Sequence, residues 1–211
     1  MRLILASTSP RRHELLALLH LPFEIVEPAY VERLSPHISP TDQARLFAEG
    51  KARSCHDLFE NSLIIGCDTL IELDSTVLGK PTDRADAARM LQRLSGQKHL
   101  IHTGVAIVST ATGKLESAVE SVHVWFKPLS SSDVDTYVAT GESLGKAGAY
   151  GIQGAGADLI ERIEGDYTAA VGLPLNTLAQ LLGRFGMIVP IDLNSLYEQK
   201  AYPNWSRFTS A

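Results

Sequence analysis

Residues 63–67 (Leu-Ile-Ile-Gly-Cys) form a continuous apolar run, and this run limits the possible folds more than any other feature of the sequence. Such a run is typical of a strand buried on both faces, so its sheet needs a covering layer on each side. Amphipathic patterns before and after it predict those layers as helices. We expect helices over residues 10–20, 39–59, 83–94, 131–140 and 173–183, and strands over 2–6, 22–26, 63–67, 101–109 and 115–126.

The last two expected strands form a hairpin, because only residues 110–113 (Thr-Ala-Thr-Gly) separate them. A hairpin among alternating strands and helices predicts an α/β fold with a mixed sheet rather than a purely parallel one. The 211 residues suffice for one domain with an appendage. We assign residues 1–189 to that domain and residues 190–211 to an aromatic C-terminal tail that packs on the domain or on a partner.

Charge and cysteine content exclude several classes of protein. The formal net charge of −5 argues against a general nucleic-acid binder, which carries a basic surplus. Two cysteines are too few for a disulfide framework and favour a reducing, cytoplasmic location. No stretch reaches the roughly 18 consecutive apolar residues of a membrane span, so we expect no membrane partner.

Residues 7–12 (Ser-Thr-Ser-Pro-Arg-Arg) lie between an expected strand and an expected helix. Free backbone N–H groups and the helix dipole make such a junction an anion site, to which Ser7 and Ser9 add hydroxyl donors. Arg11 and Arg12 occupy a first turn that normally favours acids, and a bound anion would remove that conflict. Two solvated arginines on a surface helix are the alternative; the preceding strand favours phosphate binding.

Asp68 directly follows the buried run, where a carboxylate is costly to desolvate unless it has a partner. We interpret it as a metal ligand or a general base, with an aspartate that caps a turn as an equally weighted alternative. Glu32 lies in the polar loop 27–40 and could join Asp68 around a divalent cation, although alone it is typical of a surface acid.

Two lysines and a glycine-rich stretch complete the candidate site. Lys51 and Lys80 could bind phosphate, the second held in a turn that Pro81 stiffens. Residues 146–156 contain four glycines that allow close approach to a ligand, and Gln153 among them could hydrogen-bond a base edge. Taken singly, each of these residues is more typical of a solvated surface.

Six segments occur in the order and spacing of Maf proteins, and the chain therefore resembles that family over about residues 2–186. Maf proteins are similar in fold to inosine triphosphate pyrophosphatases, so the resemblance implies an elongated mixed sheet with two lobes about a cleft. The six segments are residues 6–12, 66–69, 79–81, 94–96, 146–154 and 171–174.

The resemblance implies a nucleoside triphosphate pyrophosphatase, which cleaves between the α and β phosphates with a divalent cation, Mg²⁺ or Mn²⁺. The partner that the resemblance implies is the nucleotide substrate. The resemblance and the aromatic tail together also imply a homodimer. Carried over by motif, Asp68 accepts the proton of water and joins Glu32 at the metal. The residues implied to bind substrate are Ser7, Ser9, Arg11, Arg12, Lys51, Thr69, Lys80 and Gln153.

Arg11, Thr69 and Gln153 match the branch of the family that acts on dTTP and UTP. The alternatives are the 7-methyl-GTP branch and, in another class, a non-catalytic nucleotide-binding regulator of cell division. The chain departs from the family pattern at Gly50, Ser143, Gly145 and Ala169, which bears on rate and selectivity more than on the reaction class.

Overall fold

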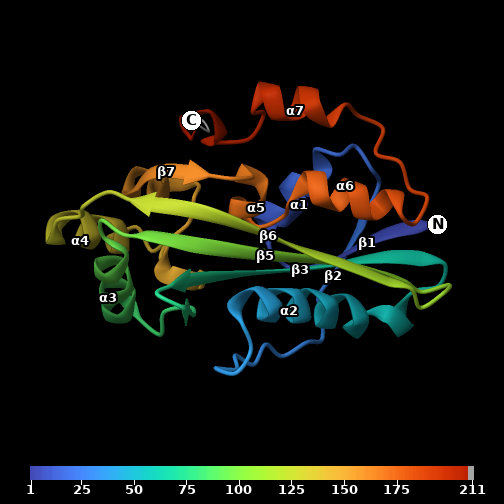
Figure 1. The fold of residues 1–211 in the computed structure, drawn as a ribbon, viewed down its shortest axis with the longest axis horizontal. Coiled ribbons are helices and arrows are strands. Elements are labelled where there is room, and N and C mark those ends of the chain that lie inside the picture. Colours follow the sequence, from blue (N-terminus) through green and yellow to red (C-terminus); the bar gives the residue numbers. More distant parts are fainter. Residues whose placement is uncertain (209–211) are drawn as a thin grey trace.

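Residues 1–208 are described by a computed structural model of the chain, in which seven strands form one mixed sheet (Figure 1). The strands are β1 (Arg2–Ala6), β2 (Glu24–Val26), β3 (Ser62–Leu73), β4 (Thr76–Leu78), β5 (Lys98–Ser109), β6 (Leu115–Phe126) and β7 (Ile160–Glu164).

Helices of very different lengths join these strands. The α-helices are α1 (Pro10–Ala17), α2 (Pro40–Ser54), α3 (Arg84–Leu94), α4 (Ser131–Ala139), α5 (Tyr167–Val171), α6 (Leu175–Gly183) and α7 (Leu193–Gln199). Short 3₁₀ segments are η1 (His56–Leu58), η2 (Ala147–Ala149), η3 (Gly154–Leu159) and η4 (Trp205–Arg207).

The sheet has the strand order β2-β1-β3-β5-β6-β7, with β4 paired to the far end of β3. Pairing is parallel among β2, β1 and β3, and antiparallel from β3 through β5 and β6 to β7. The β5–β6 hairpin makes the sheet mixed, which confirms the α/β class expected from the sequence.

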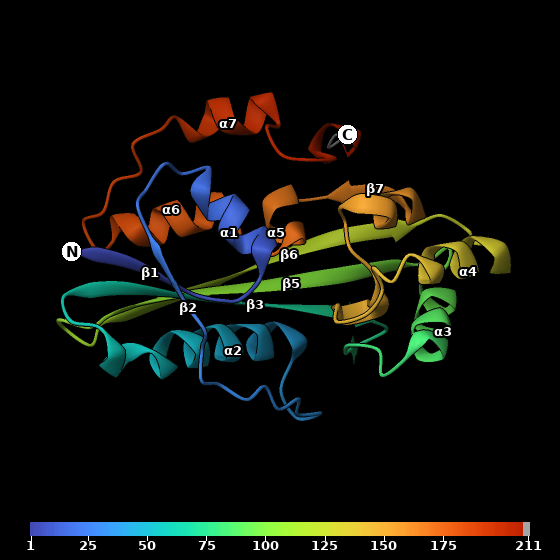
Figure 2. The same cartoon turned by 180° about the vertical axis from the view of Figure 1, so that it is seen from behind.

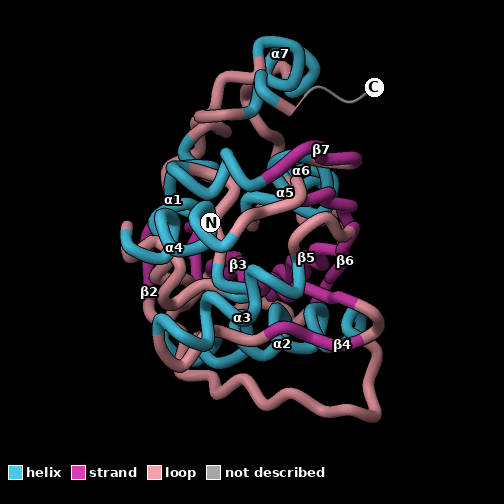
Figure 3. Tube along the Cα trace, turned by 90° about the vertical axis from the view of Figure 1, so that its left-hand side faces the viewer, coloured by secondary structure: helices cyan, strands magenta, loops and turns pink. Residues whose placement is uncertain are grey.

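Helices cover both faces of the sheet at one end (Figures 1 and 2). Helix α2 lies along one face, while α1, α5 and α6 lie on the other; α3 and α4 stand at the opposite end, and Figure 3 shows these layers end-on. The run 63–67 is buried throughout between the two layers, as its composition predicts. The two groups of helices are the two lobes that the resemblance implies.

Strand β3 is longer than its apolar run predicts. It extends to Leu73 because β5 continues to pair with it, Asp68 lying opposite Gly104. Asp68 therefore lies inside a strand rather than after one, and the alternative of a turn-capping aspartate is wrong. The apolar run that predicts this strand ends before Asp68, because aspartate is polar. The backbone hydrogen bonds between β3 and β5 continue past that residue.

Other differences are confined to element ends and short elements. The helix expected over 39–59 ends at Ser54, after which η1 forms. The glycine-rich stretch contains η2 and the start of η3, because Gly148 and Gly154 adopt positive φ and turn the chain. Four elements escaped prediction since each is too short for a periodic pattern: β4, β7, α5 and α7.

Residues 190–208 pack on their own domain, which answers the question left open for the tail. Tyr202, Trp205 and Phe208 are buried, so the tail aromatics do not form an exposed partner surface. Residues 209–211 of the expected tail lie outside the described residues.

Cys55 and Cys67 are both free and buried. Within residues 1–208, no helix combines the length and apolar character needed to cross a membrane.

Candidate active site

A short stretch of the β3 edge is left open where β1 ends. Ala6, the last residue of β1, pairs with Gly66, and β4 takes up the same edge only from Ile71. In the described part of the chain, residues 67–70 of β3 have no strand on that side. A cavity of about 660 Å³ opens there, within the usual size of ligand sites.

All ten residues that the sequence and the resemblance assign to the site line this cavity. They come from the β1–α1 junction, the loop before α2, α2 itself, β3 and the two loops flanking α3 and α4. They are Ser7, Ser9, Arg11, Arg12, Glu32, Lys51, Asp68, Thr69, Lys80 and Gln153.

The N-terminus of α1 faces the cavity, and the amides of Thr8 and Arg11 have no hydrogen-bond acceptor among the described residues. Ser9 is the N-cap residue but its side chain makes no capping hydrogen bond, and the first turn contains no acid. Ser7 is buried, and its hydroxyl accepts a hydrogen bond from the Ser9 amide at 3.2 Å. The turn is therefore held in shape by Ser7 while its positive end remains available to an anion.

Arg12 connects three parts of the fold beside the cavity. Its Nε donates to the Gly172 carbonyl at 2.9 Å, and a terminal nitrogen donates to Thr69 Oγ1 at 3.1 Å. The Thr69 hydroxyl also contacts that of Thr103 at 3.1 Å. The hydroxyl of Thr69 is thus engaged by two protein partners, Arg12 and Thr103.

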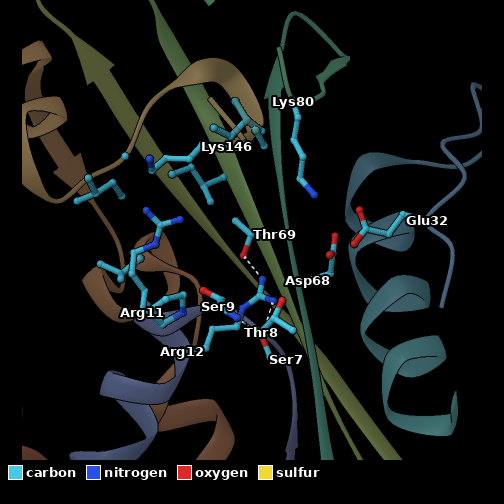
Figure 4. Close-up of a pocket in the computed structure, with 18 of the residues that line it drawn as sticks. Ser7, Thr8, Ser9, Arg11, Arg12, Glu32, Asp68, Thr69, Lys80 and Lys146 are labelled. Atoms are coloured by element: carbon cyan, nitrogen blue, oxygen red, sulfur yellow. Dashed lines mark hydrogen bonds between the residues drawn. The ribbon is translucent and has the colours of Figure 1, made fainter. Parts of the chain in front are cut away.

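Asp68, Lys51 and Glu32 form a compact charged cluster on the α2 face of the sheet. Lys51 Nζ donates to Asp68 Oδ1 at 2.5 Å and to Glu32 Oε1 at 2.6 Å. The remaining oxygen of Asp68, Oδ2, is buried without a hydrogen-bond partner among the described residues. Figure 4 shows the carboxylates of Glu32 and Asp68 facing each other.

The pKa values of the two carboxylates are shifted in opposite directions. Desolvation raises the pKa of Asp68 above its usual value, against the opposing charges of Lys51 and Arg12. Burial alone would also raise the pKa of Glu32, but its hydrogen bond to Lys51 and the charges of Lys51 and Lys80 lower it overall. Asp68 is therefore the better proton acceptor and Glu32 the more constant anion.

Two strand glycines bring α2 close enough for this cluster to form. A Cβ on Gly66 would lie 2.1 Å from the Ala48 carbonyl oxygen, and one on Gly104 would lie 2.2 Å from that of Ala44. Because both contacts are with helix backbone, no side-chain adjustment relieves them. The close packing places Lys51, one turn along the same helix, directly over Asp68.

Gly50 has a local role that the sequence does not reveal. A Cβ there would lie 2.2 Å from the ring of Tyr30, so the missing side chain makes room for that ring. Tyr30 lies two residues before Glu32 and packs against Phe47 of α2. Glycine at residue 50, which departs from the family pattern, thus allows the loop that carries Glu32 to pack against α2.

The cavity is locally cationic in a chain of net charge −5. Lys146, which belongs to the glycine-rich motif, lines the cavity as well, although the sequence does not single it out as a site residue. Its ammonium donates to the Glu142 carbonyl. The cationic lining residues are Arg11, Arg12, Lys51, Lys80 and Lys146, against the carboxylates of Glu27, Glu32 and Asp68.

The carboxylates fit a hard divalent cation. Asp68 Oδ2 is a buried oxygen without a partner, and Glu32 supplies further oxygens beside it. No group of three or more acidic, histidine or cysteine side chains with metal-binding geometry occurs in residues 1–208. Two carboxylates suffice for Mg²⁺ when substrate phosphates and water complete its coordination.

An elongated mixed sheet with one cationic cleft at an open strand edge defines the class as an α/β anion-binding protein. Comparison with protein families narrows this class, because the model described as "Maf-like protein" matches residues 2–185. The chain belongs to the Maf-like family.

Several curated relatives are similar over nearly their whole length. A protein of Moorella thermoacetica is 46% identical over 188 residues, which are 89% of this chain and 97% of the relative. One of Pelotomaculum thermopropionicum is 44% identical over 184 residues, 87% of this chain and 96% of the relative. One of Bacillus cytotoxicus is 44% identical over 184 residues, with 87% and 95% covered. All three carry the name dTTP/UTP pyrophosphatase.

Proposed function

We propose that this protein is a nucleoside triphosphate pyrophosphatase that hydrolyses dTTP and UTP to the monophosphate and pyrophosphate. The observation that carries the proposal is a cavity lined by five cationic side chains and by Asp68, one oxygen of which is buried with no hydrogen-bond partner among residues 1–208. The names of the relatives support the choice of substrates.

Cleavage of the α–β anhydride requires a water molecule to lose a proton as it attacks phosphorus. Asp68 Oδ2 accepts that proton, and burial raises the pKa of this carboxyl towards the range in which a base is effective. Lys51 fixes the other oxygen, Oδ1, and so orients the carboxylate. Glu32 and Asp68 would hold a divalent cation, which would neutralise part of the phosphate charge.

The cationic side chains bind and align the triphosphate. Arg11 and Lys146 approach the cavity from one side and Lys80 from the other (Figure 4). The N-terminus of α1 adds backbone donors between them. Phosphoryl transfer depends mainly on such positioning and charge neutralisation, which this arrangement provides.

The proposal is tested by pyrophosphate release with Mg²⁺ or Mn²⁺ across dTTP, UTP, CTP, dATP, GTP, ITP and 7-methyl-GTP. Turnover of dTTP and UTP, abolished by chelation, is the expected result. Turnover of 7-methyl-GTP instead would retain the reaction but reject the roles of Arg11, Thr69 and Gln153 in base selection. Nucleotide binding without turnover would favour a non-catalytic regulator.

A cytoplasmic location and a homodimer belong to the same proposal. Two free cysteines support a reducing compartment. The homodimer now stands on the family resemblance alone, since the tail aromatics are buried within the chain. Light scattering of the purified protein tests it: a monomer mass would reject the dimer.

A further inference from the structure

The C-terminal tail, residues 190–208, touches the part of the site assigned to the nucleobase. The family match ends at residue 185, so this segment is additional to the shared fold. It passes over α6 and α1 as α7 and ends near β7 (Figures 1 and 2). A segment in that place can influence the site only if it is fixed and reaches a binding residue.

Aromatic side chains fix the tail. Trp205 stacks on Tyr167 with ring centroids 5.4 Å apart, and the Tyr167 hydroxyl donates to the Pro203 carbonyl at 2.6 Å. Earlier in the tail, the Tyr197 hydroxyl donates to Asp166 Oδ2 at 2.9 Å. These contacts hold both ends of the segment against the start of α5.

Tyr202 carries the tail to the first turn of α1. Its hydroxyl donates to Glu14 Oε2 at 2.6 Å and lies 3.5 Å from the Arg11 carbonyl oxygen. Two residues further on, Asn204 Nδ2 donates to the Ile152 carbonyl at 3.5 Å. The tail thereby joins the backbone at Arg11 to the loop that holds Gln153.

Arg11 depends on such outside support. No described residue accepts a hydrogen bond from its guanidinium group, which lies beside Gly151 at the wall of the cavity. An arginine without acceptors keeps its donors for a ligand, but its position is then set by its backbone and its packing. Tyr202 touches that backbone directly.

We propose that Tyr202 is a positioning residue for nucleobase selection, holding Arg11 and Gln153 at the spacing that accepts a pyrimidine with a 4-carbonyl group. This inference rests on the proposed function. The tail therefore supports the base subsite from outside, because none of residues 190–208 lines the cavity itself.

The test compares Tyr202→Phe with the unmodified full-length enzyme. We expect the KM for UTP to rise about fivefold, as for loss of one hydrogen bond, with kcat unchanged. Discrimination of UTP over CTP in kcat/KM should fall by a similar factor. The inhibition constant of tripolyphosphate, which has no base, should not change, whereas general damage to the site would weaken it.

Two further variants separate positioning from stability. Tyr197→Phe removes another tail hydroxyl, one that is bonded to Thr168 and Asp166 and makes no hydrogen bond to Arg11 or Gln153, so it should lower the melting temperature and leave UTP selectivity intact. Asn204→Gly keeps the positive φ of 63° and removes only the bond to Ile152, so it should weaken UTP selectivity in the direction of Tyr202→Phe.

The outcomes distinguish the two proposals. If the unmodified enzyme hydrolyses UTP while Tyr202→Phe keeps its KM and selectivity, this inference is rejected and the proposed function stands. An equal loss of tripolyphosphate affinity in Tyr202→Phe would also reject it. If the unmodified enzyme hydrolyses no nucleotide, the proposed function fails and this inference fails with it.

Discussion

At the scale of single residues, the site depends on the different surroundings of the two oxygens of the buried Asp68 carboxylate. Asp68 has one oxygen bound by Lys51 and one without a partner in the described part of the chain, so its two oxygens have different tasks. The side chain of Lys51 is only 10% exposed, and it contacts a carboxylate on either side. Such a cluster is costly to assemble unless a ligand uses it.

Replacement of Asp68 by asparagine tests the assigned base. The amide of an asparagine cannot accept the proton of water, so kcat should fall by about a hundredfold or more. Calorimetry should still detect nucleotide binding, because the cationic side chains are unchanged. Asp86→Asn, at the surface start of α3, serves as the control and should retain full turnover. Undiminished turnover in Asp68→Asn would reject Asp68 as the base.

His99 predicts a pH dependence of stability. Burial lowers its pKa from 6.5 to about 4, and its Nε2 pairs with the Tyr150 hydroxyl at 2.6 Å. Between those two pH values, His99 binds a proton in the unfolded chain but not in the folded protein. The contribution of His99 to the free energy of unfolding is therefore fully present above pH 6.5 and is lost as the pH falls towards 4. The loss amounts to about 3 kcal/mol.

Urea denaturation at several pH values measures this effect. His99→Gln cannot titrate, so its free energy of unfolding should fall less between pH 6.5 and pH 4 than that of the unmodified protein. His37→Gln, at an exposed position, is the matched control. Parallel pH profiles for His99→Gln and the unmodified protein would contradict the prediction.

At the scale of elements, the site is set by the distance between α2 and the sheet. The glycines at 66 and 104 admit the helix backbone, and β1 stops at Ala6 so that the next part of β3 faces the cavity. The site requires both features. The two glycines let Lys51 reach Asp68, and the end of β1 leaves this pair open to a ligand.

Gly66→Ala should separate α2 from the sheet. The added Cβ meets the backbone of Ala48 and Ala52, so we expect a loss of about 3 kcal/mol in the free energy of unfolding and a marked loss of turnover. Gly183→Ala is the control, because a Cβ there meets nothing within 4 Å; it should gain up to about 1 kcal/mol from helix propensity. Equal stability of the two variants would contradict this account.

At the scale of the whole molecule, charge is unevenly distributed. The chain has a net charge of −5, yet five cationic side chains line the cavity. A cationic cleft on an acidic protein concentrates the field where a polyanion binds and leaves the rest of the surface unattractive to nucleic acid.

Substrate binding should therefore weaken with ionic strength. Raising KCl from about 0.05 M to about 0.5 M shortens the screening length to a few ångströms, so the KM for dTTP should rise several-fold while kcat changes little. Sucrose at matching osmolality is the control. A KM that is independent of salt would show that long-range attraction by the cleft is unimportant.

The sequence by itself determined the fold class, and it predicted site residues that the fold brings to one cavity. The apolar run 63–67, the hairpin and the amphipathic helices are local patterns, and local patterns follow from periodicity and capping. The ten candidate site residues all line one cavity, because motifs such as residues 7–12 carry their own turn chemistry.

Only the tertiary structure decided how those residues are used. Asp68 lies inside β3 because β5 pairs with it, and Thr69 is bound by Arg12 because strand neighbours point to opposite faces. Tyr202 and Arg11 are 191 residues apart in the sequence, yet the hydroxyl of one lies 3.5 Å from the carbonyl oxygen of the other. Such contacts depend on pairing and packing between distant segments, which no local pattern encodes.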